Sequence, residues 1–132
     1  MRTRTKARQR AVEALFEAEQ RGVEVNQVFE RNPQVNEYAI NIAQTAWSNL
    51  GQVDEVINTY SKQWPVDRMP AVDRAILRLA VAEMIFSKDI DTAVVIAEAV
   101  EVTKQLSTEE SVKFVNGLLG NIGAIRSSLQ VW

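Results

Sequence analysis

Residues 7–18 read Ala7-Arg-Gln-Arg-Ala-Val-Glu-Ala-Leu-Phe-Glu-Ala18, and this stretch decides the type of fold. Its alanines recur every three or four positions, so at 100° per residue they fall within about 60° of arc on an α-helix. They are Ala7, Ala11, Ala14 and Ala18. Because side chains this small let another helix approach closely, the stretch predicts a central helix of a helical bundle.

The same helical spacing of apolar residues continues through nearly all of the 132 residues. No stretch alternates convincingly with period two, and three prolines and five glycines provide few breaks. We therefore expect an all-α fold, a compact bundle of about seven helices in two helical subdomains. The expected helices cover residues 5–21, 24–31, 35–50, 52–63, 68–87, 93–106 and 108–126.

Turn residues place the breaks between these helices. Asn32-Pro33 separates the second helix from the third, and Gly51 separates the third from the fourth. Trp64-Pro65 closes the first half of the chain. We therefore treat residues 1–132 as a single domain with an N-terminal half of about 1–64 and a C-terminal half of about 65–132.

Two helix starts carry capping signals. Asp67 can cap the fifth helix, with Pro70 in the first turn. The stretch Ser107-Thr-Glu-Glu110 predicts a capping box at the last helix, with the Ser107 hydroxyl at N-cap and the Glu110 carboxylate at N3.

The composition argues against catalysis. The chain has no Cys and no His, so it lacks thiol nucleophiles, the commonest general base and the commonest metal ligands. It also has no phosphate-binding GxxxxGK loop and no convincing pair of carboxylates. We expect no enzyme activity, no cofactor and no metal.

The sequence gives no sign of a membrane segment. The longest apolar run, residues 93–97, is far too short to span a bilayer. No apolar segment follows the basic N-terminus, so it does not resemble a secretory signal. We expect a cytoplasmic protein.

Charge is distributed very unevenly along the chain. The first ten residues contain five basic side chains and no acidic one, whereas the rest contains ten basic and all 17 acidic residues. We call these five residues the basic head: Arg2, Arg4, Lys6, Arg8 and Arg10. A basic segment on an otherwise acidic protein predicts a docking surface for an anionic partner, with nucleic acid favoured and an acidic protein as the alternative.

Two of these basic residues could form ion pairs within their own helix instead of binding an external partner. Lys6 and Arg10 lie together on the helical wheel and can pair with Glu13 and Glu17, each pair contributing only a few tenths of a kcal/mol. Three basic residues have no acidic neighbour in the sequence: Arg2, Arg4 and Arg8. The start of a helix disfavours positive charge, so something outside the helix should compensate it.

The last helix has an unusual polar face. Lys113, Asn116, Gly117 and Gly120 lie opposite its apolar residues, and each glycine inside a helix costs about 1 kcal/mol relative to alanine. Either a neighbouring helix packs on this face, or a ligand backbone lies close to it with Lys113 and Asn116 as donors. Phe114 is read as a core residue in preference to a stacking platform.

Glu83 lies within the apolar arc of the helix predicted at 68–87, where an unpaired carboxylate would be costly. We expect it to bond backbone amides or a cationic neighbour. Three other large residues are interpreted as packing: Trp47, Tyr60 and Trp64.

Several stretches resemble one family. Residues 4–16, the segment Asp67-Arg-Met-Pro-Ala-Val-Asp-Arg-Ala-Ile-Leu-Arg78, and Ser111-Val-Lys-Phe-Val-Asn-Gly117 are similar to the NusB family of bacterial transcription antitermination factors. Residues 93–101 also match the family, and the resemblance covers roughly residues 3–126.

The resemblance implies a fold of two helical subdomains and a non-enzymatic function. It implies RNA binding to the boxA element of ribosomal RNA transcripts together with NusE, a ribosomal protein of the small subunit. That pair joins the RNA polymerase antitermination complex to suppress termination. Some relatives form dimers, so the resemblance leaves a homodimer open. A helical protein–protein adaptor, with its basic N-terminus docked on an acidic partner, remains the alternative.

The resemblance also assigns roles to particular residues. The RNA-binding residues that it implies are the basic head together with Glu110, Ser111, Lys113, Phe114 and Asn116. Phe16 and Asp73 fall at NusE-facing positions. The family often has Tyr and Glu at these two places, so the aromatic ring and the charge are kept while a hydroxyl and one methylene are lost.

Overall fold

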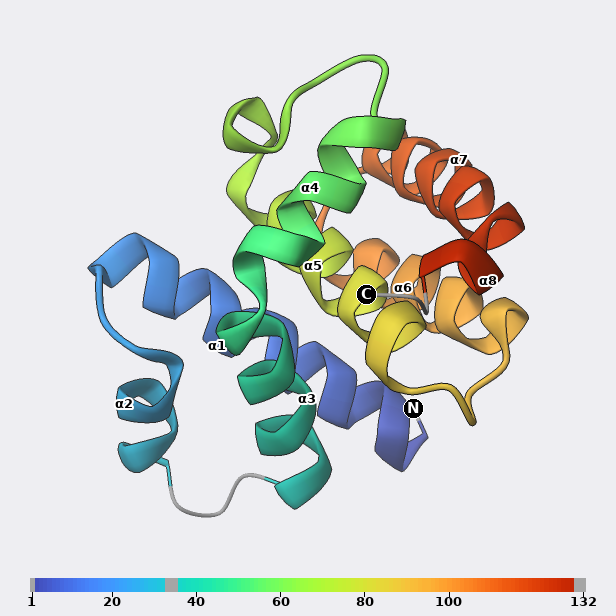
Figure 1. Ribbon diagram of the computed structural model, residues 1–132. Coiled ribbons are helices and arrows are strands. Elements are labelled where there is room, and N and C mark those ends of the chain that lie inside the picture. The colour runs from blue at the N-terminus through green and yellow to red at the C-terminus, as the bar shows by residue number, and fades with distance from the viewer. Residues whose placement is uncertain (1, 33–35, 130–132) are drawn as a thin grey trace.

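The computed structural model describes residues 2–32 and 36–129 (Figure 1). In these residues it contains no strand, which confirms the all-α fold. The helices are α1 (Thr3–Arg21), α2 (Val25–Glu30), α3 (Glu37–Ser48), α4 (Leu50–Tyr60), a 3₁₀ turn (Val66–Arg68), α5 (Ala71–Phe86), α6 (Thr92–Leu106), α7 (Glu109–Ala124) and α8 (Arg126–Leu129). No helix in the described part of the chain is long and apolar enough to cross a membrane.

Helix α5 forms the centre of the bundle, with α1, α3, α4, α6, α7 and α8 packed around it (Figure 1). Eleven of its 16 residues are buried. Apolar or small residues occupy almost every side of this helix, which is typical of a helix surrounded by others.

The alanine stripe of α1 is buried, as predicted, and none of its four members is more than 4% exposed. This helix packs against α2, α3, α5 and α6. Gly22 ends it in the left-handed conformation, at φ 67°, and its N–H bonds the carbonyls of Ala18 and Glu19.

The predicted break at Gly51 is wrong, because Gly51 lies inside α4. The break falls at Asn49, whose backbone leaves the helical region at φ −124° and ψ 28°. The Asn49 side chain donates a hydrogen bond to the Thr45 carbonyl. Asparagine competes with the helix through such local bonds, so it can end a helix where glycine does not.

The predicted start of the fifth helix is also wrong. Asp67 lies in the 3₁₀ turn, and Pro70 precedes α5 as its N-cap residue. Met69 is extended, at φ −71° and ψ 150°. Proline disfavours the helical conformation at the residue before it, and Pro70 itself is non-helical at ψ 138°, so α5 begins at Ala71.

The cap of the last helix lies one residue later than predicted. Thr108 is the N-cap residue, and its hydroxyl accepts a hydrogen bond from the Ser111 backbone N–H. Glu110 is therefore not the N3 residue, and its side chain is exposed. Ser107 instead bonds the Asp73 carboxylate.

Candidate nucleic-acid interface

Four members of the basic head are exposed at the start of α1: Arg2, Arg4, Lys6 and Arg10. Arg2 is the N-cap residue, and the first turn contains no acidic side chain. The Arg4 guanidinium lies 4.5 Å from the centre of the Tyr38 ring, a distance typical of a cation–π contact. The start of α1 thus presents a concentration of exposed positive charge.

Arg8 differs from the other four because it is only 3% exposed. Its Nε donates to Glu83 Oε1 at 2.8 Å and its Nη2 to Glu83 Oε2 at 2.9 Å. Arg8 Nη1 also lies 3.7 Å from Glu98 Oε1. Arg8 was predicted to contact an external anion, and its enclosed position does not allow that contact. The cationic neighbour expected for Glu83 is confirmed, and it is Arg8.

The environment of this ion pair alters two pKa values. Burial opposes the charge on Arg8, but the hydrogen bonds and charge of Glu83 outweigh it and raise the pKa of Arg8. Burial, followed by the nearby Glu83 charge, raises the pKa of Tyr38. Thr5 Oγ1 donates to Glu98 Oε2 at 2.6 Å, which joins the start of α1 to α6. We call Arg8, Glu83 and Glu98 the interior ion centre.

The expected surface pairs form only in part. Arg10 lies 3.5 Å from Glu13, with both side chains about half exposed. Glu17 pairs with Arg21 instead, at 2.8 Å. Within residues 2–32 and 36–129, Lys6 has no ion pair. Of the four exposed cations of the basic head, Arg10 is the only one with an ion pair among the described residues.

The start of α7 supplies the second group of predicted site residues. Glu110, Lys113 and Asn116 are exposed, while Phe114 is half-buried. Ser111 is buried, and its hydroxyl donates to Asp73 Oδ2 at 2.7 Å. Ser107 donates to the other oxygen of the same carboxylate, also at 2.7 Å. These bonds fix the start of α7 on α5.

The two predicted partner-facing residues lie at different depths. Phe16 is half-buried on α1 and packs against the core. Asp73 is only 1% exposed, so its carboxylate is covered. The structure therefore leaves Phe16 partly accessible and places Asp73 beneath Ser107 and Ser111.

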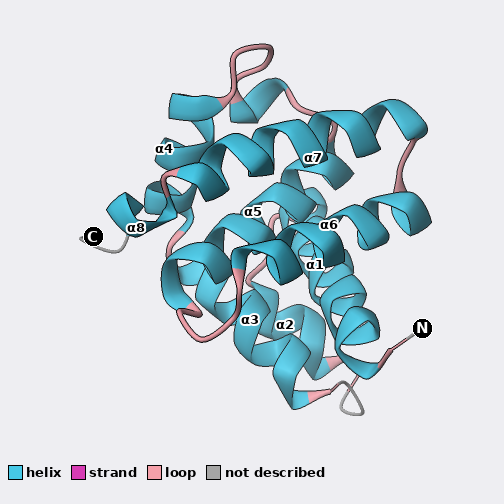
Figure 2. Cartoon of the chain, turned by 90° about the vertical axis from the view of Figure 1, so that its right-hand side faces the viewer, coloured by secondary structure: helices cyan, strands magenta, loops and turns pink. Residues whose placement is uncertain are grey.

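The starts of α1 and α7 lie on one side of the molecule. Figure 2 shows the start of α1, the end of α6 and the start of α7 along its right-hand edge. Arg2 and Thr5 line a shallow hollow together with Glu101 and Gln105 of α6. The structure thus places two helix starts that are about 100 positions apart in the sequence along the same edge.

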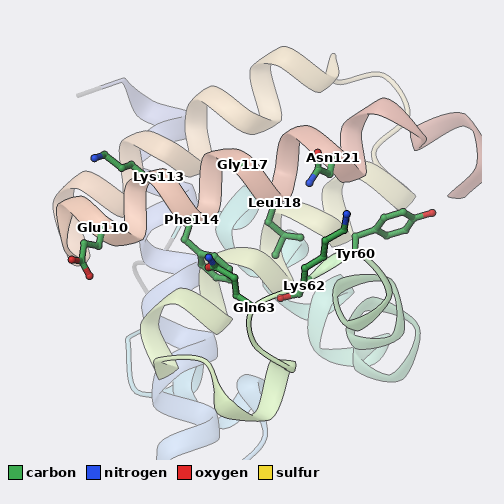
Figure 3. Close-up of a pocket in the computed structure, with 10 residues that line it drawn as sticks. Tyr60, Lys62, Gln63, Glu110, Lys113, Phe114, Gly117, Leu118 and Asn121 are labelled. Atoms are coloured by element: carbon green, nitrogen blue, oxygen red, sulfur yellow. The ribbon is translucent and has the colours of Figure 1, made fainter.

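A groove runs along α7 beside the segment that follows α4 (Figure 3). Residues 60–63 form one wall, and Phe114, Gly117 and Asn121 lie on the other. We call it the α7 groove. Its volume is about 400 Å³.

The sequence did not predict the exposure of Trp64, which directly follows this segment. Trp64 was interpreted as a packing residue, but it is 42% exposed. Its ring stands edge-on to Phe114, at 5.2 Å between centroids and 69° between planes. The only signal in the sequence was its place in a loop, directly before Pro65 and close to Lys62.

The glycines of α7 resolve one of the open alternatives. An added Cβ would meet nothing within 4 Å at Gly117 or Gly120. Among the described residues no helix packs against these two glycines, so the structural reason predicted for them is wrong. The close contact lies at Gly123, where a Cβ would stand 2.7 Å from Thr92 Cγ2. Gly117 and Gly120 are exposed and leave the helix backbone open to an external molecule.

The chemistry of this surface is that of binding. Among the residues that the structure describes, no three His, Cys, Asp or Glu side chains gather as metal ligands would. The surface instead combines cations, amide groups and an exposed aromatic edge, which can bind phosphates and bases.

Comparisons with known proteins match the chain to one family. The NusB family model matches residues 5–124. The chain is 46% identical over 134 residues to the transcription antitermination protein NusB of Kineococcus radiotolerans, with 98% of each chain covered.

Solved structures are similar as well. NusB of T. maritima has a TM-score of 0.81 and 36% identity, covering 94% of this chain and 93% of that one. A crystal structure of the antitermination factors NusB and NusE in complex with dsRNA also has a TM-score of 0.81. It is 32% identical and covers 94% of this chain and 98% of that one. Since sequence and fold match over nearly the whole length, the chain belongs to the NusB family.

Proposed function

We propose that the protein is a non-enzymatic transcription antitermination factor that acts on ribosomal RNA transcripts. It binds their boxA RNA together with NusE, and the complex joins RNA polymerase to suppress termination. Transcription places this activity in the cytoplasm. The family relationship supports the role, and the relative solved with NusE and dsRNA supports the kind of partners.

One observation carries the RNA-binding part of this proposal. The start of α1, which carries exposed cations, and the start of α7, which carries exposed polar groups, lie along the same edge of the bundle (Figure 2). Single-stranded RNA is recognised by a basic track for its phosphates and by groups that contact its splayed bases. This side of the protein offers both.

The two groups have different proposed roles. Arg2, Arg4, Lys6 and Arg10 supply positive charge for phosphates, whereas Arg8 supports their helix from within. Lys113 and Asn116 contact phosphate or base edges, and Phe114 offers a ring edge to a base. Glu110 lies beside them and can accept from a base amino group. Ser111 holds the segment in place through Asp73.

Phe16 and Asp73 are the proposed NusE-facing residues. Phe16 can contact a partner directly because its ring is partly exposed. Asp73 is covered, so its contribution is indirect and passes through the hydroxyls of Ser107 and Ser111.

The salt dependence of binding tests the role of the head. Each phosphate contact to single-stranded RNA contributes about −0.7 to the slope of log K against log salt. Four exposed cations therefore predict a slope of about −3 for boxA RNA. Titrations with boxA RNA and a scrambled strand, with and without NusE, would measure it. A slope near zero, or equal weak binding of both strands in both conditions, would contradict the proposal.

Stoichiometry tests the assembly. Co-purification of the protein with NusE and boxA RNA, followed by sizing, should give a 1:1:1 complex. A free homodimer that NusE cannot separate would contradict this assembly.

A further inference from the structure

The α7 groove has features that the proposed head and α7 start do not explain. It extends along α7 from Lys113 to Asn121, opposite the segment that carries Lys62 and Gln63. Figure 3 shows Phe114 and Leu118 pointing from α7 toward that segment, and Lys62 extending from the segment toward α7. On α7, the RNA-binding residues proposed above end at Asn116, so the part of the groove from Gly117 to Asn121 has no assigned role.

An aromatic edge is exposed at this groove. Phe114 lines it, and Trp64 meets the Phe114 ring edge-on while remaining 42% exposed. A tryptophan left this open has unused apolar area and a ring face on which a base can stack.

The bare backbone of α7 lies next to this edge. Gly117 lines the groove, and Gly120 follows one turn later on the exposed face. Both weaken the helix, and an added Cβ would meet nothing within 4 Å at either place. Packing within the part of the chain that the structure describes does not account for these two glycines. A ligand backbone that approaches α7 closely would.

Charge favours a polyanion as the occupant. Lys62 and Lys113 line the groove, and Glu110 is the only carboxylate among its lining residues. Lys113 and Phe114 also belong to the proposed RNA-binding set, so the groove continues that surface along α7 (Figure 3). A strand that carries both bases and phosphates matches an aromatic edge between two lysines.

We propose that the α7 groove binds one unstacked nucleotide of the single-stranded RNA, just beyond the part held at the start of α7. Trp64 stacks on the base, Lys62 binds an adjacent phosphate, and the open backbone at Gly117 admits the sugar–phosphate chain. This inference rests on the proposed function and adds Trp64, Lys62 and Gly117 to it.

The first test removes the aromatic side chain. Trp64→Ala in the full-length protein with NusE should weaken binding of boxA RNA by about 5-fold to 150-fold, the range for losing one base–aromatic stack. Trp64→Phe should retain most of the affinity, since it keeps a ring. Circular dichroism and thermal unfolding would show that both variants are folded.

The second test separates binding from stability. Gly117→Ala should raise the midpoint of thermal unfolding by about 2–4 °C, because alanine favours the helix. It should at the same time lower the affinity for RNA. Gly51 is a matched control, since it is exposed in α4 with nothing within 4 Å of an added Cβ. Gly51→Ala should leave RNA affinity unchanged.

The outcomes distinguish this inference from the function on which it rests. If Trp64→Ala and Gly117→Ala bind boxA RNA like the wild type while Arg2→Ala/Lys6→Ala does not, the groove inference is overturned and the function stands. If Trp64→Ala loses NusE but keeps RNA binding by the free protein, the groove is a protein site and the inference is overturned. If the wild type binds no RNA, the proposed function itself fails.

Discussion

Arg4 and Arg8 stand one turn apart on α1, and both approach the ring of Tyr38, at 4.5 and 5.6 Å. Arg4 is exposed, whereas Arg8 is enclosed with Glu83 and Glu98. The same residue type in one basic segment is thus either enclosed in the fold, as Arg8 is, or left exposed, as is Arg4, which we propose binds RNA. The difference comes from a carboxylate 75 positions away in the sequence, not from the neighbours of either arginine.

The strongest test of this comparison removes the charge of the interior ion centre. Arg8→Ala should lower the free energy of unfolding by about 3–5 kcal/mol, because it leaves the Glu83 carboxylate buried without its partner. Urea unfolding followed by circular dichroism would measure it. The double variant Arg8→Met/Glu83→Met should recover much of the loss. A loss below about 1 kcal/mol for Arg8→Ala would mean that the pair is not needed to keep Glu83 in the interior.

The second largest effect concerns Asp73, another enclosed carboxylate. Asp73→Ala removes the acceptor for Ser107 and Ser111, and charged hydrogen bonds contribute about 1.5–3 kcal/mol. We expect a loss of about 2 kcal/mol in unfolding free energy together with weaker RNA binding, since the start of α7 loses its anchor. Ser107→Ala keeps the Ser111 bond and is the milder control. If the RNA affinity of Asp73→Ala were unchanged, the hydrogen bonds to Asp73 would not be needed for RNA binding.

Exposed cations should show the reverse pattern. Arg4→Ala should change the unfolding free energy by no more than about 1 kcal/mol, because its cation–π contact is at the surface. It should make the slope of log K against log salt for boxA RNA less negative by about 0.7. RNA titrations between about 50 and 200 mM salt would measure this. An unchanged slope would mean that Arg4, unlike our proposal, meets no phosphate.

The smallest effect should appear in the pH dependence of stability. Burial raises the pKa of Glu19, but hydrogen bonds from Arg74 and Arg78 outweigh it, so the pKa is lowered. The folded pKa then lies below the unfolded value of about 4.3. The stabilisation is therefore complete above that value and disappears as pH falls through the folded pKa. Urea midpoints from pH 7 to 3 should fall less steeply for Glu19→Gln than for the wild type.

Glu17 provides the matched control for that measurement. It lies two residues away and pairs with Arg21 at the surface, where an ion pair contributes little. Glu17→Gln should keep the wild-type pH profile. If both variants changed the profile equally, the contrast between enclosed and exposed pairs would fail for this helix.

Local periodicity was enough to predict much of this fold. The alanine stripe, the helical class and the need of Glu83 for backbone amides or a cationic neighbour all follow from spacing along single helices. The sequence could not show which cation Glu83 would take, because that depends on how α1 and α5 meet. Adjacent hydroxyls at Ser107 and Thr108 could each cap α7, and spacing alone does not choose between them.

For the candidate site, the sequence likewise predicted which residues share a helix face, but not what lies opposite that face. The wheel placed Gly117 and Gly120 together on the polar face of α7, but what lies opposite a face is set by tertiary packing. Trp64 stands in a loop, where no periodicity indicates burial. Both features became informative only when the segment after α4 was seen beside α7 (Figure 3).

The long reach of the interior ion centre also bears on synthesis. Arg8 meets Glu83 across 75 positions, and Thr5 meets Glu98 across 93. At about 5–20 residues per second, roughly 4–15 s pass between translation of Arg8 and of its partner. During that interval Glu83 has not yet been made, so none of the five basic side chains has a partner on α5. They also lie near the RNA of the ribosome, which is a polyanion. Once α5 and α6 are complete, Arg8 is enclosed with Glu83 and Glu98 and can no longer bind an external anion. The other four basic side chains stay exposed.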